Sequence, residues 1–85
     1  MASYRVEVKP SARKELERFS NQLLARITGR LETLACNPRP PGCKKLKGGD
    51  KEWRVRVGDY RVVYTVDDQK LLVEVTRIRH RSEGY

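Results

Sequence analysis

The chain has 85 residues and carries 19 lysines and arginines against 11 aspartates and glutamates, a formal net charge of +8. This length predicts a single domain over residues 1–85, with a thin core of two layers. The charge favours nucleic acid, an anionic membrane surface or an acidic protein as partner. No apolar run could span a bilayer and no signal-peptide pattern opens the chain, so the cytoplasm is the expected location.

The first part of the chain predicts a strand and two helices. Residues 3–9 alternate between apolar and charged side chains, which is typical of a strand. Ser11 is the expected N-cap of a first helix with Ala12, Leu16 and Phe19 on its apolar face. A break at Ser20 or Asn21 precedes a second helix. Its apolar stripe contains Leu23, Leu24, Ile27, Leu31 and Leu34.

Residues 38–52 are predicted to form a loop, because their prolines and glycines disfavour regular secondary structure and their lysines favour exposure to solvent. Leu46 is expected to pin this loop to the core. The two cysteines, Cys36 and Cys43, are expected to be free thiols in a reducing compartment. With the lone His80 they supply too few ligands for a zinc site, so neither a metal ion nor another cofactor is expected.

The stretch from Trp53 to Thr65 predicts a hairpin, since Gly58 and Asp59 separate two β-branched runs. A two-residue turn there places Arg56 opposite Arg61. Alternation then gives the hairpin two different faces. One face carries Val55, Val57, Tyr60, Val62 and Tyr64, and the other carries Arg54, Arg56, Arg61, Val63 and Thr65.

A turn over residues 67–70 and a last strand over residues 71–79 complete the sheet. The expected register places Val73 opposite Tyr64, Val75 opposite Val62, Glu74 opposite Val63 and Thr76 opposite Arg61. Alternation decays after Thr76, which indicates a bulge or the sheet edge. The predicted fold class is α+β, in the order β-α-α-β-β-β, with a helical hairpin packed on one face of a small antiparallel sheet.

The basic face is the candidate functional site. Like charges opposite each other cost stability, and an anionic ligand would compensate Arg56 and Arg61. Guanidinium groups suit phosphate, because they bind its oxygens bidentately. Alternatively, Glu74 and Glu83 neutralise part of this face and water solvates the rest. The further basic candidates are Lys44, Lys45 and Lys47 in the loop, and Arg77, Arg79, His80 and Arg81 in the tail.

Two aromatic side chains near this face have competing interpretations. Trp53 either stacks on a base or caps the core, and the second is the commoner role. His80 either acts as a general acid or base or is merely solvated. The sequence contains no Ser/His/Asp arrangement, phosphate loop or metal-ligand spacing, so catalysis would be metal-free. The fitting reaction is attack of a ribose 2′-OH on the neighbouring phosphate, which composition permits without showing it.

The residues from Trp53 to Tyr64, the run from Val73 to Ile78 and the His80-Arg81 pair resemble the RelE/ParE toxin superfamily of toxin–antitoxin systems. The resemblance covers nearly the whole chain. It implies one of two activities. RelE-like members are ribosome-dependent endoribonucleases that cleave mRNA in the A site. ParE-like members share the fold but poison DNA gyrase and lack the catalytic set.

The resemblance implies roles for individual residues. Arg54, Arg56 and Arg61 would hold the phosphate, Arg81 would support the leaving group, and Tyr85 would be the candidate base. The best-known RelE pattern has lysines at the first two positions. An arginine is a poor base, so that role falls to Tyr85 or His80. The hairpin turn is also shorter here, and no helix follows the tail.

The RelE branch is favoured because the chain has the basic pair Arg54 and Arg56 together with Arg61, Arg81 and Tyr85. The resemblance therefore implies an mRNA interferase with the ribosome and mRNA as targets and no membrane partner. Two alternatives stay open, a ParE-like gyrase inhibitor and a catalytically inactive relative that binds RNA or antitoxin. Both branches are neutralised by an antitoxin, here expected to be RelB-like, whose acidic or amphipathic segment would cover the basic face.

Overall fold

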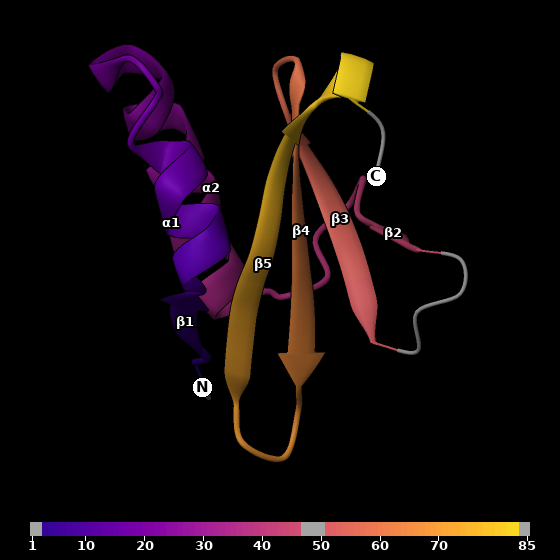
Figure 1. Cartoon of the computed structure of the whole chain (residues 1–85). Helices are drawn as coiled ribbons and strands as arrows, with labels where there is room; N and C mark the ends of the chain where they lie inside the picture. The colour runs from indigo at the N-terminus through magenta and orange to yellow at the C-terminus, as the bar shows by residue number, and fades with distance from the viewer. Residues whose placement is uncertain (1–2, 47–50, 84–85) are drawn as a thin grey trace.

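The computed structural model describes residues 3–46 and 51–83, and in these residues two helices cover one face of a five-stranded sheet (Figure 1). The elements are β1 (Arg5–Val8), α1 (Pro10–Leu16), α2 (Asn21–Cys36), β2 (Lys44–Lys45), β3 (Glu52–Val57), β4 (Tyr60–Asp67), β5 (Leu72–His80) and the 3-10 helix η1 (Arg81–Glu83). The strand order is β1-β5-β4-β3-β2, with β1 parallel to β5 and the other pairs antiparallel. The predicted α+β fold is confirmed, and β2 is a strand within the segment predicted as a loop.

The two helices have different N-terminal capping residues. Ser11 is not the N-cap of α1, because α1 starts earlier, with Lys9 as its N-cap and Pro10 in its first turn, where a proline loses no hydrogen bond. The Ser11 hydroxyl instead donates to the carbonyl oxygen of Thr76 at 3.0 Å. Ser20 does cap α2, since its Oγ accepts from the backbone N–H of Leu23 at 3.2 Å. Neither described helix is long and apolar enough to cross a membrane.

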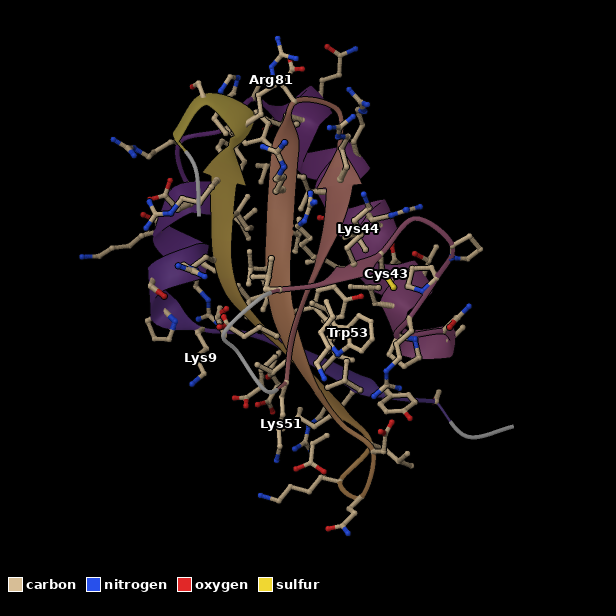
Figure 2. The ribbon with its side chains drawn as sticks, turned by 90° about the vertical axis from the view of Figure 1, so that its right-hand side faces the viewer. Lys9, Cys43, Lys44, Lys51, Trp53 and Arg81 are labelled. Atoms are coloured by element: carbon tan, nitrogen blue, oxygen red, sulfur yellow. The ribbon has the colours of Figure 1, made fainter. Side chains whose placement is uncertain are left out.

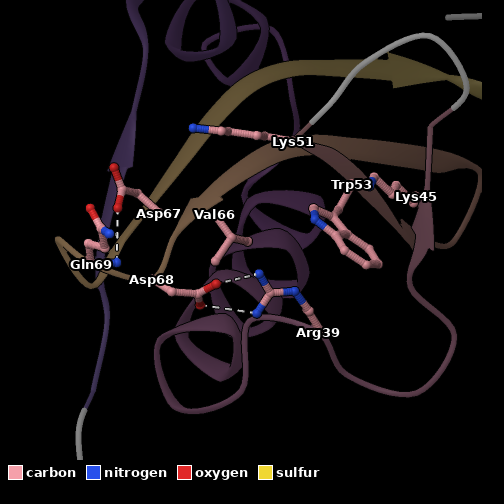
Figure 3. A pocket seen from close by; sticks show the side chains of 8 residues that line it. All are labelled: Arg39, Lys45, Lys51, Trp53, Val66, Asp67, Asp68 and Gln69. Carbon is pink, nitrogen blue, oxygen red and sulfur yellow. Dashed lines mark hydrogen bonds and ion pairs between the residues drawn. The ribbon is translucent and has the colours of Figure 1, made fainter.

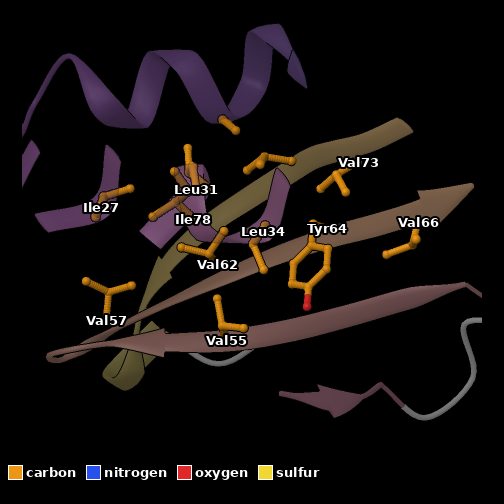
Figure 4. Packing of buried hydrophobic residues seen from close by; sticks show 12 residues of the cluster. Ile27, Leu31, Leu34, Val55, Val57, Val62, Tyr64, Val66, Val73 and Ile78 are labelled. Atoms are coloured by element: carbon orange, nitrogen blue, oxygen red, sulfur yellow. The ribbon is translucent and has the colours of Figure 1, made fainter. Parts of the chain in front are cut away.

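The core lies between the two helices and the sheet (Figure 4). Its buried residues are Ala12, Ile27, Leu31, Leu34, Val55, Val57, Val62, Tyr64, Val66, Val73, Val75 and Ile78. The fully buried Tyr64 donates its hydroxyl to the carbonyl oxygen of Pro38 at 2.7 Å, and burial raises the pKa of that phenol. Leu46, which was expected to pin the loop, is only half-buried, whereas Cys43 packs against this core.

The hairpin register is confirmed in full. Gly58 has φ +59°, a conformation that a primed turn requires and that glycine adopts at no steric cost. The turn pairs Val57 with Tyr60, Arg56 with Arg61 and Arg54 with Val63. The sheet face that carries Arg56 and Arg61 is therefore the one opposite the core.

The predicted register between β4 and β5 is wrong. The turn lies one residue later than expected, because the Asp67 side chain accepts from the backbone N–H groups of Gln69 and Lys70, each at 3.0 Å, and Leu71 takes a φ of 52°. Tyr64 consequently faces Val75 rather than Val73. The pairs seen in place of the other three expected ones are Val62 with Ile78, Val63 with Arg77 and Arg61 with Arg79.

A bulge in β5 restores the alternation. Tyr64 pairs with Val75 and Val63 with Arg77, which leaves Thr76 as an inserted residue with no opposite partner. Ile78 thereby enters the core, while Arg77 moves to the other face. Of the two alternatives predicted for the region after Thr76, a bulge or the sheet edge, the structure shows the bulge.

Candidate nucleic-acid interface

Six basic side chains share the open face of the sheet, and this set is called the arginine face below. It contains Lys44, Arg54, Arg56, Arg61, Arg77 and Arg79. Opposed residues form two rungs, because side chains of directly paired residues point to the same side. The upper rung is Arg56–Arg61–Arg79, and the lower rung is Lys44–Arg54–Val63–Arg77. Figure 2 looks onto this side, with the helices behind the sheet.

The rungs have an apolar floor. Val63 is fully buried although it lies outside the core cluster, and its two cross-strand neighbours are Arg54 and Arg77. Arginine stems cover apolar surface in this way while their guanidinium groups reach water. The face is therefore shaped by packing as well as by charge.

Carboxylates gather at one end of this face. Glu52 forms an ion pair with Arg77 at 3.5 Å, and its strand neighbour Thr65 is in turn paired with Glu74. The register predicted from the sequence placed Glu74 opposite Val63, two residues from Arg61. The observed register moves Glu74 two positions along β4, away from the upper rung. Positive charge thus accumulates at the end of the sheet near the hairpin turn.

A cavity of about 370 Å³ opens among these side chains. Its lining consists of Arg30, Gly42, Lys44, Arg54, Arg56 and Arg61. Arg30 comes from α2 and was not among the site residues predicted from the sequence. Its buried Nε makes no hydrogen bond to any residue that the structure describes. The available signal was the spacing of Arg26 and Arg30, one helical turn apart beside the apolar stripe of α2.

Arg81 lies at the end of the sheet, beside the hairpin turn (Figure 2). Its backbone N–H donates to the Asp59 carbonyl oxygen at 2.8 Å, and its Nε lies 3.8 Å from Asp59 Oδ1. Both side chains are about two-thirds exposed, so this ion pair is weak. The Arg81 guanidinium remains available to a ligand next to the upper rung.

His80 does not join the arginine face. It pairs with Tyr60, which lies on the helix-covered side, and the two rings meet edge to face at 5.1 Å. Tyr60 in turn contacts Phe19 at 4.8 Å. The His80 Nδ1 accepts from the backbone N–H of Ser82 at 3.2 Å and lies 2.8 Å from the Ser82 hydroxyl. The register shift at the bulge explains this placement, which could not be predicted from the sequence.

Of the remaining predicted site residues, only Lys45 lies within the described part of the chain. Lys45 pairs with Trp53, so its side chain points to the face opposite Lys44. Lys47 and Tyr85 lie outside the described residues. Among the described residues, no group of three His, Cys, Asp or Glu side chains could hold a metal ion.

A second, larger cavity of about 520 Å³ lies beside Trp53 (Figure 3). Its wall contains Arg39, Trp53 and Asp68. Together with Tyr4, which hydrogen-bonds to Asp68, these residues are called the Arg39 clamp. Arg39 donates two hydrogen bonds to Asp68 at 2.9 and 3.2 Å and stacks 5.3 Å from the Trp53 ring. Tyr4 donates to the same carboxylate at 2.6 Å. Trp53 also packs against the core, which confirms its core-capping role.

Charge within the clamp is matched. Hydrogen bonds, chiefly from Arg39 and secondly from Tyr4, hold the pKa of Asp68 below its ordinary value. The hydrogen bond that Tyr4 donates to Asp68 raises the pKa of the Tyr4 hydroxyl. The clamp joins the start of β1, the segment after α2 and the β4–β5 turn. It therefore ties the fold together, whereas on the arginine face basic residues are paired with one another across the strands.

Comparison with known proteins gives a consistent family. The family model described as ParE toxin of type II toxin–antitoxin system, parDE, matches residues 6–85. A protein of Methanocaldococcus jannaschii named RelE1 is 32% identical over 85 residues, which span 96% of this chain and 94% of that protein. Toxin RelE of Mycobacterium tuberculosis is 31% identical over 83 residues, which span 96% of this chain and 86% of that protein.

The fold agrees with these sequence matches. The crystal structure of the archaeal RelE–RelB complex from Pyrococcus horikoshii superposes with a TM-score of 0.85 at 25% identity, covering 96% of this chain and 99% of that chain. Sequence and fold thus point to the same group of proteins over nearly the whole length. The chain belongs to the RelE/ParE toxin superfamily of type II toxin–antitoxin systems.

Proposed function

We propose that this toxin is a RelE-like mRNA interferase, a ribosome-dependent endoribonuclease that cleaves mRNA in the A site and so inhibits translation in the cytoplasm. The observation that carries the proposal is the upper rung, where Arg56, Arg61 and Arg79 stand directly opposite one another on three neighbouring strands. Such an arrangement costs stability in the free protein. A phosphate between these groups would turn that repulsion into binding energy.

The chemistry requires no metal ion. The ribose 2′ oxygen attacks the adjacent phosphorus, the bond from phosphorus to the 5′ oxygen breaks, and the products carry a 2′,3′-cyclic phosphate and a 5′-OH. The 2′ proton passes to a base, and an acid returns a proton to the leaving 5′ oxygen. Arg56 and Arg61 would stabilise the extra negative charge on the phosphoryl oxygens as the fifth bond forms.

The remaining roles follow from where the side chains lie. Arg81, beside the hairpin turn, would support the leaving group, while Arg54 and Lys44 would hold a neighbouring part of the strand. His80 faces the helices, so we assign it no direct part in proton transfer. Tyr85, two residues beyond η1, is our candidate for the base.

We also propose that a RelB-like antitoxin neutralises this toxin. A solved structure similar to this chain is a RelE–RelB complex, and the arginine face presents six basic side chains on one side of the sheet to an acidic segment. Charge complementarity of this kind favours fast and specific association.

The decisive experiment is primer extension on an mRNA in a purified translation reaction with the full-length protein. We expect new 5′ ends within A-site codons, only when ribosomes are present, and none when the nucleotide before the cut lacks its 2′-OH. Arg81→Ala should abolish the cuts while antitoxin binding persists. Arg18→Ala, on the α1–α2 connection, is the matched control and should cleave like the wild type. Absence of cuts with a folded, toxic protein would refute the proposal.

A second candidate function is inhibition of DNA gyrase. It is favoured by the family model itself, whose description names ParE toxins. In that case the protein would inhibit supercoiling by purified gyrase and leave mRNA intact. A supercoiling assay run beside primer extension separates the two functions, because each predicts activity in only one assay.

A further inference from the structure

The outer edge of β3 is only partly covered by its neighbouring strand. Within the described residues, β2 pairs with Trp53 and Arg54 and leaves the stretch Val55–Val57 without a strand on that side. A hollow of about 450 Å³ lies between this end of β3 and α2, and it is called the edge hollow below. Its lining consists of Arg26, Gly29, Arg30, Thr33, Arg56, Val57 and Gly58.

The edge hollow is cationic and contains no acidic side chain in its lining. Arg26, Arg30 and Arg56 form no ion pair with any residue in the described part of the chain. The guanidinium of Arg26 lies so close to the hairpin turn that a Cβ on residue 58 would come within 3.3 Å of it. Glycine at this position thus lets Arg26 approach the backbone, and three guanidinium groups share one site.

The floor of the hollow is open at Gly29. A Cβ added there would meet no atom within 4 Å, although this glycine sits inside a helix, where it costs stability relative to alanine. Alanine would fit sterically, so packing does not require glycine here. A bare backbone instead leaves room for a ligand between α2 and β3.

Two arginines connect the edge hollow to the arginine face. Arg30 and Arg56 line both this hollow and the cavity that contains Arg54 and Arg61. The two sites are therefore neighbours on one continuous basic surface that passes round the edge of β3. A polyanion bound in one of them would be directed into the other.

We propose that the edge hollow binds a phosphodiester that flanks the scissile one on the same RNA strand. Planar guanidinium groups bind phosphate oxygens bidentately and hold their charge at any pH at which the protein is folded. The strand would cross the edge of β3, with one phosphate against the upper rung and another between Arg26 and Arg56. The identity of the ligand as RNA rests on the proposed function.

The test is a charge contrast at Gly29 in the full-length protein. Gly29→Glu places a carboxylate in the hollow, and Gly29→Gln places an uncharged side chain of the same size there. Both residues favour helix more than glycine does, so folding is preserved. The probes are a fluorescent octanucleotide and a trinucleotide, both with 2′-O-methyl riboses that cannot be cleaved. Binding is followed by anisotropy over a series of salt concentrations.

We expect Gly29→Glu to bind the octanucleotide about fivefold more weakly than Gly29→Gln at low salt, and the trinucleotide equally well. Arg26→Gln should lower the slope of log K against log salt by about 0.7, the value for one lost phosphate contact on a single strand. Arg18→Gln should leave the slope unchanged.

Two other outcomes would overturn the inference. If both Gly29 variants bind alike while Arg61→Gln weakens binding, the edge hollow is not a phosphate site, but the proposed function stands. If Arg61→Gln also binds like the wild type, the arginine face does not bind RNA, and both proposals fail together.

Discussion

The Arg39 clamp and the arginine face hold the same functional group in opposite surroundings. In the clamp, one guanidinium meets a bidentate carboxylate and an aromatic ring, and that carboxylate also accepts from Tyr4. On the arginine face, three guanidinium-bearing residues stand in register with one another, and the carboxylates lie toward the other end of the sheet. The type of residue is thus a poor guide to its role, whereas its partners are informative. Removal of a cation should cost stability in the clamp and function on the face.

The largest effect is expected for Arg61→Ala, at the centre of the upper rung. Loss of a group that stabilises charge in the transition state typically slows a reaction by about 10²–10³-fold. Single-turnover cleavage of mRNA on stalled ribosomes measures this rate. The melting temperature should change little, because the variant also removes a like-charge contact. Wild-type cleavage by a folded Arg61→Ala protein would contradict the assignment.

Tyr64→Phe should have the next largest effect, and it concerns stability. The variant leaves the buried Pro38 carbonyl without its hydrogen bond, which costs about 1–3 kcal/mol of unfolding free energy. Urea denaturation gives this value directly. Val66→Ala, at another buried position of β4, is the control, because it changes the packing without removing a hydrogen bond. Cleavage by the Tyr64→Phe protein should be unchanged below its melting temperature.

A matched pair of surface substitutions tests the comparison itself. Arg39→Gln removes the cation of the clamp and should lower the melting temperature by a few degrees at most, because the pair is partly exposed. Arg56→Gln removes a cation opposite Arg61 and should raise the melting temperature slightly. Thermal melts at low and high salt measure both changes, and salt should shrink each of them. Shifts of the same sign would show that the two regions do not differ as described.

The smallest effect is a dependence of stability on pH. Asp68 has a pKa below its ordinary value of 3.8 in the folded protein, chiefly because Arg39 donates hydrogen bonds to it. The contribution of its charge to the free energy of unfolding is therefore present above pH 3.8, and it disappears as the pH falls through the lower pKa of the folded state. Melting temperatures of wild type and Asp68→Asn should converge across this acid range. A constant difference would mean that the carboxylate charge is not responsible.

The local signal at the β3–β4 turn gave a correct register, whereas the register between β4 and β5 could not be predicted from local signals. The hairpin register follows from two residues, Gly58 and Asp59, because a two-residue turn leaves no freedom in pairing. The β4–β5 register depends on Leu71 adopting a left-handed φ, which is unfavourable for a bulky side chain and which no propensity indicates. The upper rung owes its third member, Arg79, to that register.

The site was predicted in the same uneven way. Arg54, Arg56 and Arg61 could be placed together from alternation within one hairpin. Arg30 could not, because its position depends on how α2 packs beside the edge of β3. His80 was counted among the basic residues of the tail, and its orientation could not be predicted because one inserted residue decides which way the end of β5 faces.

Thr76 is that inserted residue, and it joins two parts of the molecule. Its hydroxyl donates to the Val63 carbonyl oxygen at 3.2 Å, while its own carbonyl oxygen accepts from Ser11 on α1. Side chains along β5 alternate between the two faces of the sheet, and the inserted Thr76 shifts this alternation by one residue for all the residues that follow it. A chain without it would keep Arg77, Ile78 and Arg79 on their present faces but lose the carbonyl oxygen that accepts the hydrogen bond from Ser11 on α1. We therefore expect homologues to tolerate a gap at this position only where the first helix is held by another contact.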